Sequence, residues 1–579
     1  MDDNPEAAEA LSRFNRMLLD AALRPLWQGH ESGASGLLKA FADGITQDPE
    51  RWHELHRRYG RKQLELWSNL VDADPARPVA GGAAPADRRF RGAEWRLPYF
   101  SYLAESYLLA AQWLRETVDA AKLDPQARRK LDFFSRQWID AMSPANFPWS
   151  NPEAIRLAAE TRGESLASGL KNLAADLDTG LVSMTDEQAF EVGRNLAVTP
   201  GAVIYENDFM QLIQYRPATA AVFERPLLMV PPCINKFYIL DLQPENSFVR
   251  FAVEEGHTVF MMSWRNMPVS MGRATWDDYL EHGVIKALAL AREICGVDRV
   301  NALGFCVGGT LLASALAAAG HGGRTPAASV TLLTTMLDYS DTGELSVFID
   351  EAHVSRREQE FRHGGVLHGR ELALTFASLR ANDLIWNYVV NNYLKGRTPE
   401  PFDLLYWNSD STDLPGAMYV YYLRNMYLEN NLRVPHRLTM CGVPVDLGTI
   451  DAPAYFLASR EDHIVPWKTA YAGKRLLPGR PEFVLAASGH IAGVINPAAR
   501  KRRNYWINTS VTEDPEQWLV NAETCPGSWW SHWSAWLAQH SGKMVAARAK
   551  LGGGAHTEIE PAPGRYVREK SIRQAATPA

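Results

Sequence analysis

The sequence predicts an α/β protein with a parallel sheet, an α-rich N-terminal region and a cap inserted into the sheet domain. Three observations lead to this expectation. From residue 226 onward, short apolar segments alternate with helical segments, which is the pattern of βαβ units. That alternation breaks over 338–443, where a long, aromatic-rich helical stretch intervenes. The first third of the chain instead repeats apolar residues at helical spacing.

The N-terminal third divides into two helical parts joined by a linker. A helical extension is expected over 1–72, and its first helix has the apolar positions Leu11, Phe14, Met17, Leu18, Ala21 and Leu23. Residues 73–86 are rich in Pro, Gly and Ala, which is typical of a flexible linker. Residues 87–195 show helical patterns again, for instance over 102–122 and 126–142, and form the expected α-rich N-terminal domain.

Six short apolar segments predict the strands of the sheet. They are residues 226–230, 258–263, 300–303, 330–335, 454–458 and 482–485. Helices are expected between them, over 247–255, 277–294 and 310–319. The sheet domain is therefore expected in two parts, 196–337 and 444–545, which the cap 338–443 separates and the tail 546–579 follows.

Composition and charge limit the classes of function. The chain has 579 residues, of which 46% are apolar and 22% charged, as in ordinary globular proteins. A net charge of −7 argues against a nucleic-acid partner, since such binding depends on Lys and Arg. No long apolar run predicts a membrane span, and the acidic start of the chain has no export signal. The 5 cysteines are scattered without CxxC spacing, which predicts reduced thiols, no metal site and a cytoplasmic location.

The segment Gly304-Phe305-Cys306-Val307-Gly308 lies between a predicted strand and a predicted helix. This is the context of a nucleophile elbow, here with Cys in place of Ser. The glycines keep the sharp turn clear of side chains, and Cys306 lies at the helix N-terminus. The helix dipole and a nearby His both favour the reactive thiolate there. The segment therefore predicts an α/β-hydrolase fold with Cys306 as its nucleophile.

A cysteine nucleophile needs a base and a group that orients the base. In this fold, the acid and then the His follow later strands. Asp462 follows the strand 454–458 and is the candidate acid, with Glu461 as its competitor. His490 follows the strand 482–485 and is the candidate base. His463 competes with it, but lies on the loop of the acid.

Two backbone N–H groups are expected to form an oxyanion hole. One is that of Val307, directly after the nucleophile. The other comes from the loop after the strand 226–230, where Pro231 and Pro232 have no N–H to donate. Either Cys233 or Ile234 must then donate, and we favour Ile234. Cys233 is therefore also expected near the site as a second thiol, and packing is its expected role.

Longer segments resemble one enzyme family. PLLMVPPCINKFYILDLQPENS, LGFCVGGT, REDHIVPW and SGHIAGVINP are similar to the corresponding segments of class I polyhydroxyalkanoate synthases. The resemblance covers nearly all of residues 140–540 and is weaker in the front 90 residues and after about 545, although EPAPGRYV at 560–567 resembles the family's ending. It implies the α/β-hydrolase fold and a catalytic Cys306, Asp462 and His490.

The resemblance also implies substrate, product and partners. Class I members polymerise short-chain (R)-3-hydroxyacyl-CoA, typically 3-hydroxybutyryl-CoA, and release CoA as a product. They use no metal or redox cofactor, act as homodimers and stay on the polyester granule in the cytoplasm, where phasin proteins are further possible partners. The resemblance also implies that Asp462 helps to activate the 3-hydroxyl of the substrate. An orienting role through His490 is the alternative.

Substrate contacts are less well defined by the sequence. Arg380 is a candidate for binding CoA, and His463 a candidate for facing the substrate. The aromatic side chains of the expected cap either line a dry site or pack within the cap itself. They are Phe376, Leu379, Trp386, Tyr388, Tyr393 and Phe402. Trp529, Trp530, Trp533 and Trp536 have helical spacing, which predicts a buried face, with polymer or granule contact as the alternative.

Two other classes of function compete with a synthase. A cysteine-dependent thioesterase or polyester hydrolase would share the triad but transfer the acyl group to water. A non-catalytic granule-coat protein would tolerate loss of the triad and favour low-complexity amphipathic helices, neither of which the sequence shows.

Overall fold

The computed structural model describes residues 31–73, 87–510 and 512–571. The apolar positions expected in the first helix, most of the linker 73–86 and the end of the tail lie outside these residues. Contacts divide the chain into two compact units. Unit 1 consists of Met1–Glu187 and Leu374–Pro401, and unit 2 of Gln188–Ala373 and Phe402–Ala579.

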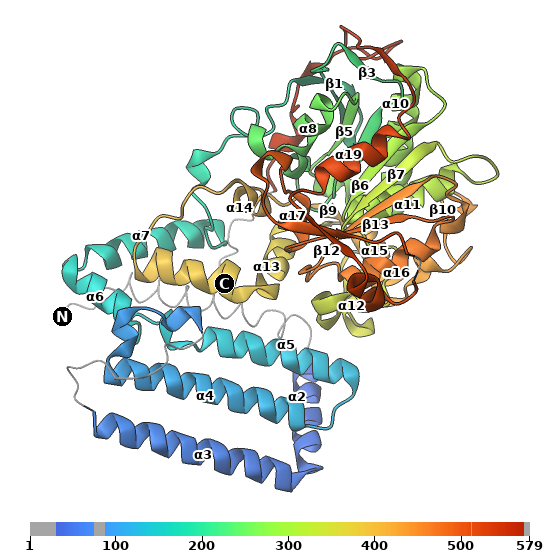
Figure 1. Cartoon of the computed structure of the whole chain (residues 1–579). Coiled ribbons are helices and arrows are strands. Elements are labelled where there is room, and N and C mark those ends of the chain that lie inside the picture. The colour runs from blue at the N-terminus through green and yellow to red at the C-terminus, as the bar shows by residue number, and fades with distance from the viewer. Residues whose placement is uncertain (1–30, 74–86, 511, 572–579) are drawn as a thin grey trace. The chain divides into compact units, whose positions relative to one another are not determined.

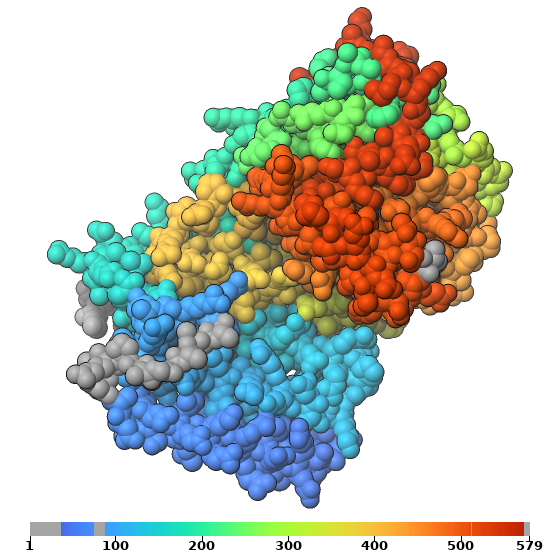
Figure 2. All heavy atoms as spheres, in the orientation of Figure 1, coloured from blue at the N-terminus to red at the C-terminus, as the bar shows by residue number. Residues whose placement is uncertain are grey.

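Unit 1 is helical. Asp48, Asp124 and Asn151 each cap a helix that has Pro in its first turn, so local sequence sets these helix starts. Helix α3 packs along α4, and in Figure 2 no other described residues lie over the lower side of α3 (blue). The helices are α2 (Glu31–Thr46), α3 (Pro49–Val71), α4 (Pro98–Ala120), α5 (Pro125–Ala141), α6 (Pro152–Glu160) and α7 (Glu164–Thr179).

The segment Leu374–Pro401, from the middle of the expected cap, belongs to unit 1. It contains the end of α13 (Gly369–Leu379) and two π-helical turns, η10 (Asn382–Trp386) and η11 (Val389–Leu394). Trp386 and Tyr393 are buried in one cluster with Leu173 of α7. The Tyr393 hydroxyl also donates to Asp176 Oδ2 at 2.6 Å. These two aromatic side chains therefore pack inside unit 1.

Unit 2 contains a sheet of 11 strands in the order β15-β14-β13-β12-β7-β6-β4-β5-β2-β1-β17 (Figure 1). Its centre is parallel, from β13 through β12, β7, β6 and β4 to β5. These strands are β4 (Leu227–Val230), β5 (Val259–Trp264), β6 (Val300–Phe305), β7 (Ala327–Leu333), β12 (Ala454–Ser459) and β13 (Glu482–Ala486). They match the six predicted segments.

Further strands, which the sequence analysis did not identify, extend the predicted parallel sheet on both sides. Antiparallel strands flank the parallel centre, so the sheet is mixed. On one side, β1 and β2 are joined by the short turn at Asn207 and Asp208, without the crossover helix that marks a βαβ unit in sequence. The added strands are β1 (Gly201–Glu206), β2 (Met210–Tyr215), β14 (Asn504–Ile507), β15 (Glu523–Pro526) and β17 (Glu560–Pro561).

Each face of the sheet is covered by helices and has its own core. Along β12, Phe456 belongs to one core, and its neighbours Tyr455 and Leu457 belong to the other, as expected for alternating side chains. The first face is covered by α10 (Lys286–Cys295) and α11 (Val307–Ala319), and the second by α8 (Phe248–Glu254) and α19 (Trp530–Ala538). With both faces covered, reactive groups are left to the ends of the strands.

The other helices of unit 2 are short. In sequence order they are α9 (Trp276–Asp278), the π-helical turn η8 (Tyr279–Ile285), α12 (Glu351–Glu360), α14 (Asp403–Asn408), α15 (Gly416–Tyr422), the π-helical turn η12 (Leu423–Leu428), α16 (Trp467–Gly473), α17 (His490–Val494) and α18 (Pro515–Val520). Three two-stranded sheets accompany them, made by β3 (Ala221–Phe223) with β16 (Met544–Ala546), β8 (Val366–Leu367) with β9 (Leu414–Pro415), and β10 (Thr439–Met440) with β11 (Val443–Pro444). Among the described residues, no helix is both long and apolar enough to cross a membrane.

Candidate active site

Cys306 occupies the turn between β6 and α11. Its backbone has φ +54° and ψ −129°, a conformation that costs a non-glycine residue about 1–3 kcal/mol and is typical of functional turns. A Cβ on Gly304 would lie 2.4 Å from the Gly309 Cα, and one on Gly308 would lie 2.4 Å from the Val230 carbonyl oxygen. Both positions therefore require glycine if the turn is to be this tight.

Backbone hydrogen bonds hold the Cys306 turn in place. The Cys306 N–H donates to the Leu333 carbonyl oxygen of the neighbouring strand at 2.9 Å. The Cys306 carbonyl oxygen accepts from the Gly309 N–H at 2.9 Å and from the Thr335 hydroxyl at 3.2 Å. These bonds fix the backbone in its strained conformation, and the half-buried Cys306 side chain extends from a rigid base.

His490 and Asp462 form a buried pair beside this turn. His490 Nδ1 lies 2.7 Å from Asp462 Oδ2, and the side chains are 5% and 0% exposed. The His490 ring also stacks on Phe305, the residue before the nucleophile, at a centroid distance of 5.7 Å. The structure thus brings His490 together with Asp462 and with the elbow, as the order of the strand ends predicts.

The orientation of Asp462 is set by its own loop. Oδ1 accepts hydrogen bonds from the backbone N–H groups of Ile464 at 2.8 Å and Val465 at 2.9 Å. Oδ2 is thereby turned toward His490. Glu461, the competing acid, is exposed. Geometry therefore favours Asp462 as the partner of His490.

The surroundings of His490 favour its protonated form. Burial alone would lower the pKa of His490, but the Asp462 carboxylate and the Cys306 sulfur together outweigh burial and raise it to about 10. Because the Cys306 sulfur contributes to the raised pKa of His490, it must lie close to the imidazole ring. At neutral pH, His490 is then an imidazolium, which can stabilise a thiolate and later donate a proton.

Two tryptophans fix the short helix α17, in which His490 is the first residue. The indole N–H groups of Trp529 and Trp530 donate to the carbonyl oxygens of Gly493 at 3.0 Å and Val494 at 2.9 Å. Trp529, Trp530 and Trp533 are at most 2% exposed. The buried face predicted for this segment is therefore present in these three residues, while the fourth, Trp536, is half-buried. The face packs where it can hold His490.

The competing residues Cys233 and His463 have different surroundings. Cys233 is 1% exposed, and burial, together with the nearby Cys306, raises its pKa to about 12. Its thiol therefore stays protonated at neutral pH, which is consistent with a packing role. His463 is half-buried on the Asp462 loop, but it is Asp462 that bonds to His490. A contact between His463 and substrate stays a prediction.

The two expected oxyanion-hole donors lie at the carboxyl ends of neighbouring strands. Val307 begins α11, and Ile234 follows β4, the strand next to β6. Neither N–H donates to a backbone oxygen within the described chain. The Ile234 carbonyl accepts from the Thr412 N–H at 2.8 Å, which ties its loop to residues 411–412. Both N–H groups are thus available, and their role stays a prediction.

Three tyrosines near Cys306, two of them buried and Tyr427 half-buried, were missed by the sequence reasoning. For Tyr339, Tyr422 and Tyr427, burial is the main cause of a raised pKa and the Cys306 sulfur adds to it, so all three lie within its electrostatic reach. The Tyr339 hydroxyl lies 3.0 Å from the Thr310 hydroxyl and donates to Tyr422 at 3.3 Å. The aromatic richness of 338–443 was the available signal, but it did not single out these residues.

Arg380 and Phe402 are the remaining candidates for contact with substrate. Arg380 belongs to unit 1, where its guanidinium lies 3.9 Å from Asp383, and its role in binding CoA stays a prediction. Phe402 is 47% exposed. The described residues also include no group of three or more His, Cys, Asp or Glu side chains that could hold a metal ion.

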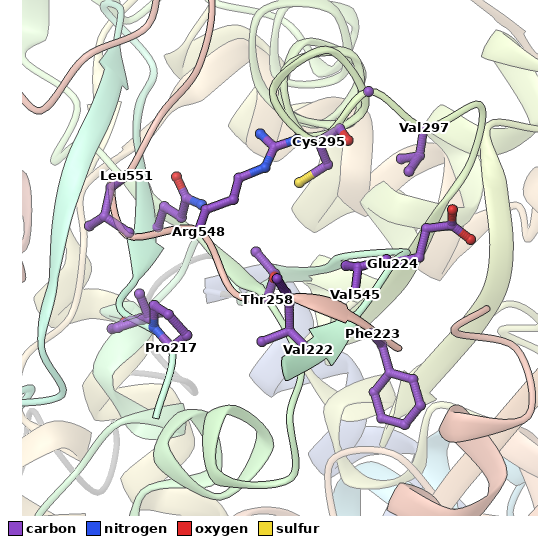
Figure 3. Close-up of a pocket in the computed structure, with 14 residues that line it drawn as sticks. Pro217, Val222, Phe223, Glu224, Thr258, Cys295, Val297, Val545, Arg548 and Leu551 are labelled. Carbon is purple, nitrogen blue, oxygen red and sulfur yellow. Dashed lines mark hydrogen bonds between the residues drawn. The ribbon is translucent and has the colours of Figure 1, made fainter. Parts of the chain in front are cut away.

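A cavity of about 280 Å³ lies at the other end of the parallel strands from Cys306 (Figure 3). Thr258 precedes β5 and Val297 precedes β6, so its walls include the amino end of β6, the strand whose carboxyl end leads to Cys306. Cys295 also lines it, and burial raises the pKa of this thiol to about 11. This cavity is separate from the candidate active site.

Fold and geometry together define an α/β-hydrolase-type protein with cysteine at its nucleophile elbow. Family models agree: "alpha/beta hydrolase fold" matches residues 226–497, and "Poly-beta-hydroxybutyrate polymerase (PhaC) N-terminus" matches residues 86–252. A solved monoacylglycerol lipase from Paleococcus ferrophilus aligns with 13% identity and a TM-score of 0.33, over 57% of this chain and 99% of its own.

Curated relatives define the family more narrowly. The poly(3-hydroxyalkanoate) polymerase subunit PhaC of Cupriavidus necator is 54% identical over 94% of each chain. The subunit from Rhizobium meliloti is 41% identical over 92% of this chain and 88% of its own. Polymerase 1 of Ectopseudomonas oleovorans is 39% identical over 88% and 90%. The chain belongs to the poly(3-hydroxyalkanoate) polymerase family.

Proposed function

We propose that this protein polymerises (R)-3-hydroxyacyl groups from their CoA thioesters into polyhydroxyalkanoate and releases CoA. It would act as a class I synthase on short-chain substrates such as 3-hydroxybutyryl-CoA. The 54% identity to the Cupriavidus necator polymerase over nearly the whole chain is the observation that carries this proposal. The His490–Asp462 pair beside Cys306 supplies the chemistry.

The first step is acylation of Cys306. Its thiolate attacks the thioester carbonyl, and the N–H groups of Val307 and Ile234 stabilise the negative oxygen that forms. The carbon–sulfur bond to CoA then breaks. The His490 imidazolium donates its proton to the departing sulfur, so that neutral CoA thiol leaves. One thioester replaces another, and the step therefore needs no external energy source and no cofactor.

The second step lengthens the chain. The 3-hydroxyl of one unit attacks the acyl thioester of the next. An ester C–O bond forms, the C–S bond of the thioester breaks, the sulfur leaves as a thiolate, and a base accepts the hydroxyl proton. His490 is neutral after acylation and can take this proton. Both oxygens of Asp462 are already engaged, Oδ1 by two backbone N–H groups and Oδ2 by His490. These contacts favour an orienting role for Asp462 over direct activation of the hydroxyl.

Transfer to a hydroxyl in place of water requires a dry site. Tyr339, Tyr422 and Tyr427 pack together near Cys306, with ring centroids 5.0 to 6.2 Å apart. Their apolar edges would exclude water. Their hydroxyls would offer polar contacts to an ester chain, and we propose that they form the wall of the acyl site.

The assembly and location of the protein are part of the same proposal. We expect a homodimer that stays on the surface of the growing polyester granule in the cytoplasm, in contact with phasin-type granule proteins. Light scattering of the purified chain, with and without substrate, tests the dimer. Co-sedimentation of the protein with polymer tests its retention on the product.

The deciding experiment incubates purified protein with (R)-3-hydroxybutyryl-CoA and follows CoA thiol and insoluble polyester together. Matching amounts of CoA and polymer are expected. Release of CoA with free 3-hydroxybutyrate and no polymer would instead identify a thioesterase, and absence of CoA release would leave the coat-protein alternative. A Cys306→Ala protein is the control for uncatalysed hydrolysis.

A further inference from the structure

The last described residues, Glu569–Ser571, lie against the loop that carries Ile234. The Lys236 ammonium donates to the Glu569 carbonyl oxygen at 2.7 Å, and Lys236 is only 2% exposed. A buried cation is costly unless it has acceptors and opposite charge nearby. The Glu569 carbonyl supplies such an acceptor from a segment more than three hundred residues away in sequence.

The next two residues make contacts of the same kind. Lys570 Nζ lies 3.0 Å from Asp410 Oδ2, and the Ser571 hydroxyl donates to Asp413 Oδ1. The side chains of Asp410 and Asp413 are 3% and 0% exposed. Three successive residues near the end of the chain thus contact buried charges, which is more than a loosely attached tail would show.

The same acidic segment also holds the Ile234 loop directly. The Thr412 N–H donates to the Ile234 carbonyl oxygen at 2.8 Å, and the Trp407 indole N–H donates to the Lys236 carbonyl oxygen at 2.7 Å. The Tyr238 hydroxyl donates to Asp410 Oδ2 at 2.9 Å. Residues 234–238 are therefore bonded to 407–413 and, through the Lys236 side chain, to 569–571.

Charge makes these contacts depend on one another. Asp410 and Asp413 are balanced by Lys236 and Lys570, with His368 Nδ1 a further 3.6 Å from Asp413 Oδ1. Removing residues 569–571 would take away Lys570 and the acceptor of the Lys236 ammonium at once. The remaining buried charges would have to regain water, and we expect the loop at Ile234 to shift because Lys236 belongs to this cluster.

We propose that Lys236 and residues 569–571 position the backbone N–H of Ile234 where negative charge forms during acylation of Cys306. Lys236 is a positioning residue here, since it acts through the Ile234 backbone. The inference rests on the proposed function only for its acylation step, which a synthase and a thioesterase share. A misplacement of about 1 Å in such a donor is enough to slow a reaction about a hundredfold.

The test compares two reactions of the same sulfur. Acylation by 3-hydroxybutyryl-CoA forms a negative oxygen, and its rate is the first-turnover release of CoA in rapid-quench experiments. Alkylation by iodoacetamide displaces iodide without such an oxygen, and mass spectrometry of the Cys306 peptide gives its rate. The variants are Lys236→Met, a chain ending after Arg568, and both together. Lys543→Met, which removes an exposed pair with Glu224, and a chain ending after Ser571 are the controls.

We expect Lys236→Met and the shortened chain each to slow acylation about tenfold to a hundredfold while alkylation keeps its wild-type rate. The combined variant should be slowed by less than the product of the two single effects, because both changes break the contact between Lys236 and Glu569. Both controls should keep the wild-type rate of acylation. Lys570→Met and Ser571→Ala, which keep the chain length, should slow acylation in the same direction if the shortened chain does not fold.

Unchanged acylation in Lys236→Met would overturn the proposal. So would acylation and alkylation falling together, since that reports general loss of structure, or effects that multiply in the combined variant. Failure of the proposed function has a different signature. The wild-type protein would then release CoA without making polymer, and the acylation rates of the variants could still be compared.

Discussion

At the scale of single residues, the site consists of one strained cysteine and one buried charge pair. Cys306, Asp462 and His490 could be predicted because a GxCxG elbow and the order of strand ends are local features of sequence. Tyr339, Tyr422 and Tyr427 could not, because a tyrosine in an aromatic-rich segment has no local mark of its distance to Cys306. The structure adds that the loop buries the Asp462 carboxylate and leaves its competitor Glu461 exposed, which agrees with the predicted choice of Asp462.

Removing either reacting group should abolish polymer synthesis without unfolding the protein. We expect Cys306→Ala and His490→Ala to retain wild-type circular dichroism and to make no polyester from (R)-3-hydroxybutyryl-CoA. Cys233→Ala and His463→Ala are matched controls and should still make polymer. Polymer formation by Cys306→Ala would refute the mechanism.

Asp462→Asn should slow acylation more than any other step. The amide cannot hold His490 in its protonated, oriented form, and loss of the equivalent contact in serine proteases costs about 10⁴-fold. Rapid-quench measurement of the first CoA released checks this. If the first CoA appears at the wild-type rate and only later turnovers are slow, Asp462 instead activates the 3-hydroxyl.

The raised pKa of His490 makes part of the stability depend on pH. A group whose pKa rises on folding, here from 6.5 to about 10, stabilises the folded state fully below the lower value. That contribution is lost as pH rises through the upper value. We therefore expect the melting temperature to fall between pH 6.5 and 10 by more in the wild type than in Asp462→Asn. If the melting temperatures of the two proteins fell by the same amount over this pH range, that result would contradict a His490 pKa of about 10.

At the scale of elements, a helix of one turn carries the catalytic base. Helix α17 is too short to be stable alone, so its position depends on the hydrogen bonds that it receives from Trp529 and Trp530. The sequence predicted the buried tryptophan face from its spacing. It could not predict the acceptors of the indole N–H groups, because these lie in another segment.

Trp530→Phe should therefore lower both stability and rate. It leaves the Val494 carbonyl without this donor, which costs about 1–3 kcal/mol. Trp533→Phe is a matched control, because the Trp533 indole donates to the Thr331 hydroxyl and not to α17. Denaturant unfolding should show similar losses for both, while the rate of CoA release should fall only in Trp530→Phe. Equal rates would mean that the indole does not position His490.

At the scale of the whole molecule, the sequence predicts the parallel strands at the centre of the sheet but not the antiparallel strands that flank them. The six parallel strands are short apolar segments separated by helices. By contrast, β1 and β2 form a hairpin, and the two residues of β17 are too few to give a pattern. The expected cap 338–443 stays a prediction as one subdomain, since 374–401 makes its contacts within unit 1.

A chain that begins at residue 188 should aggregate. It keeps 374–401 but loses the rest of unit 1, so Ala377, Ile385, Trp386 and Val389 would lose part of their buried environment. Size-exclusion chromatography and binding of an apolar dye should both reveal this. A chain that begins at residue 31 keeps the described helices and should remain monodisperse. A monodisperse chain from residue 188 would show that the segment is stable without them.

The division of unit 1 between two stretches of sequence has a consequence during synthesis on the ribosome. Its first part ends at Glu187 and its second at Pro401, so 214 residues separate the two ends. At about 5–20 residues per second, translation of that interval takes roughly 10–40 s. Throughout this time, the nascent helices lack the side chains that complete their core. The yield of folded protein would therefore depend on what protects these helices in the meantime. Either a chaperone binds them, or α7 folds slowly until Trp386 has been synthesised.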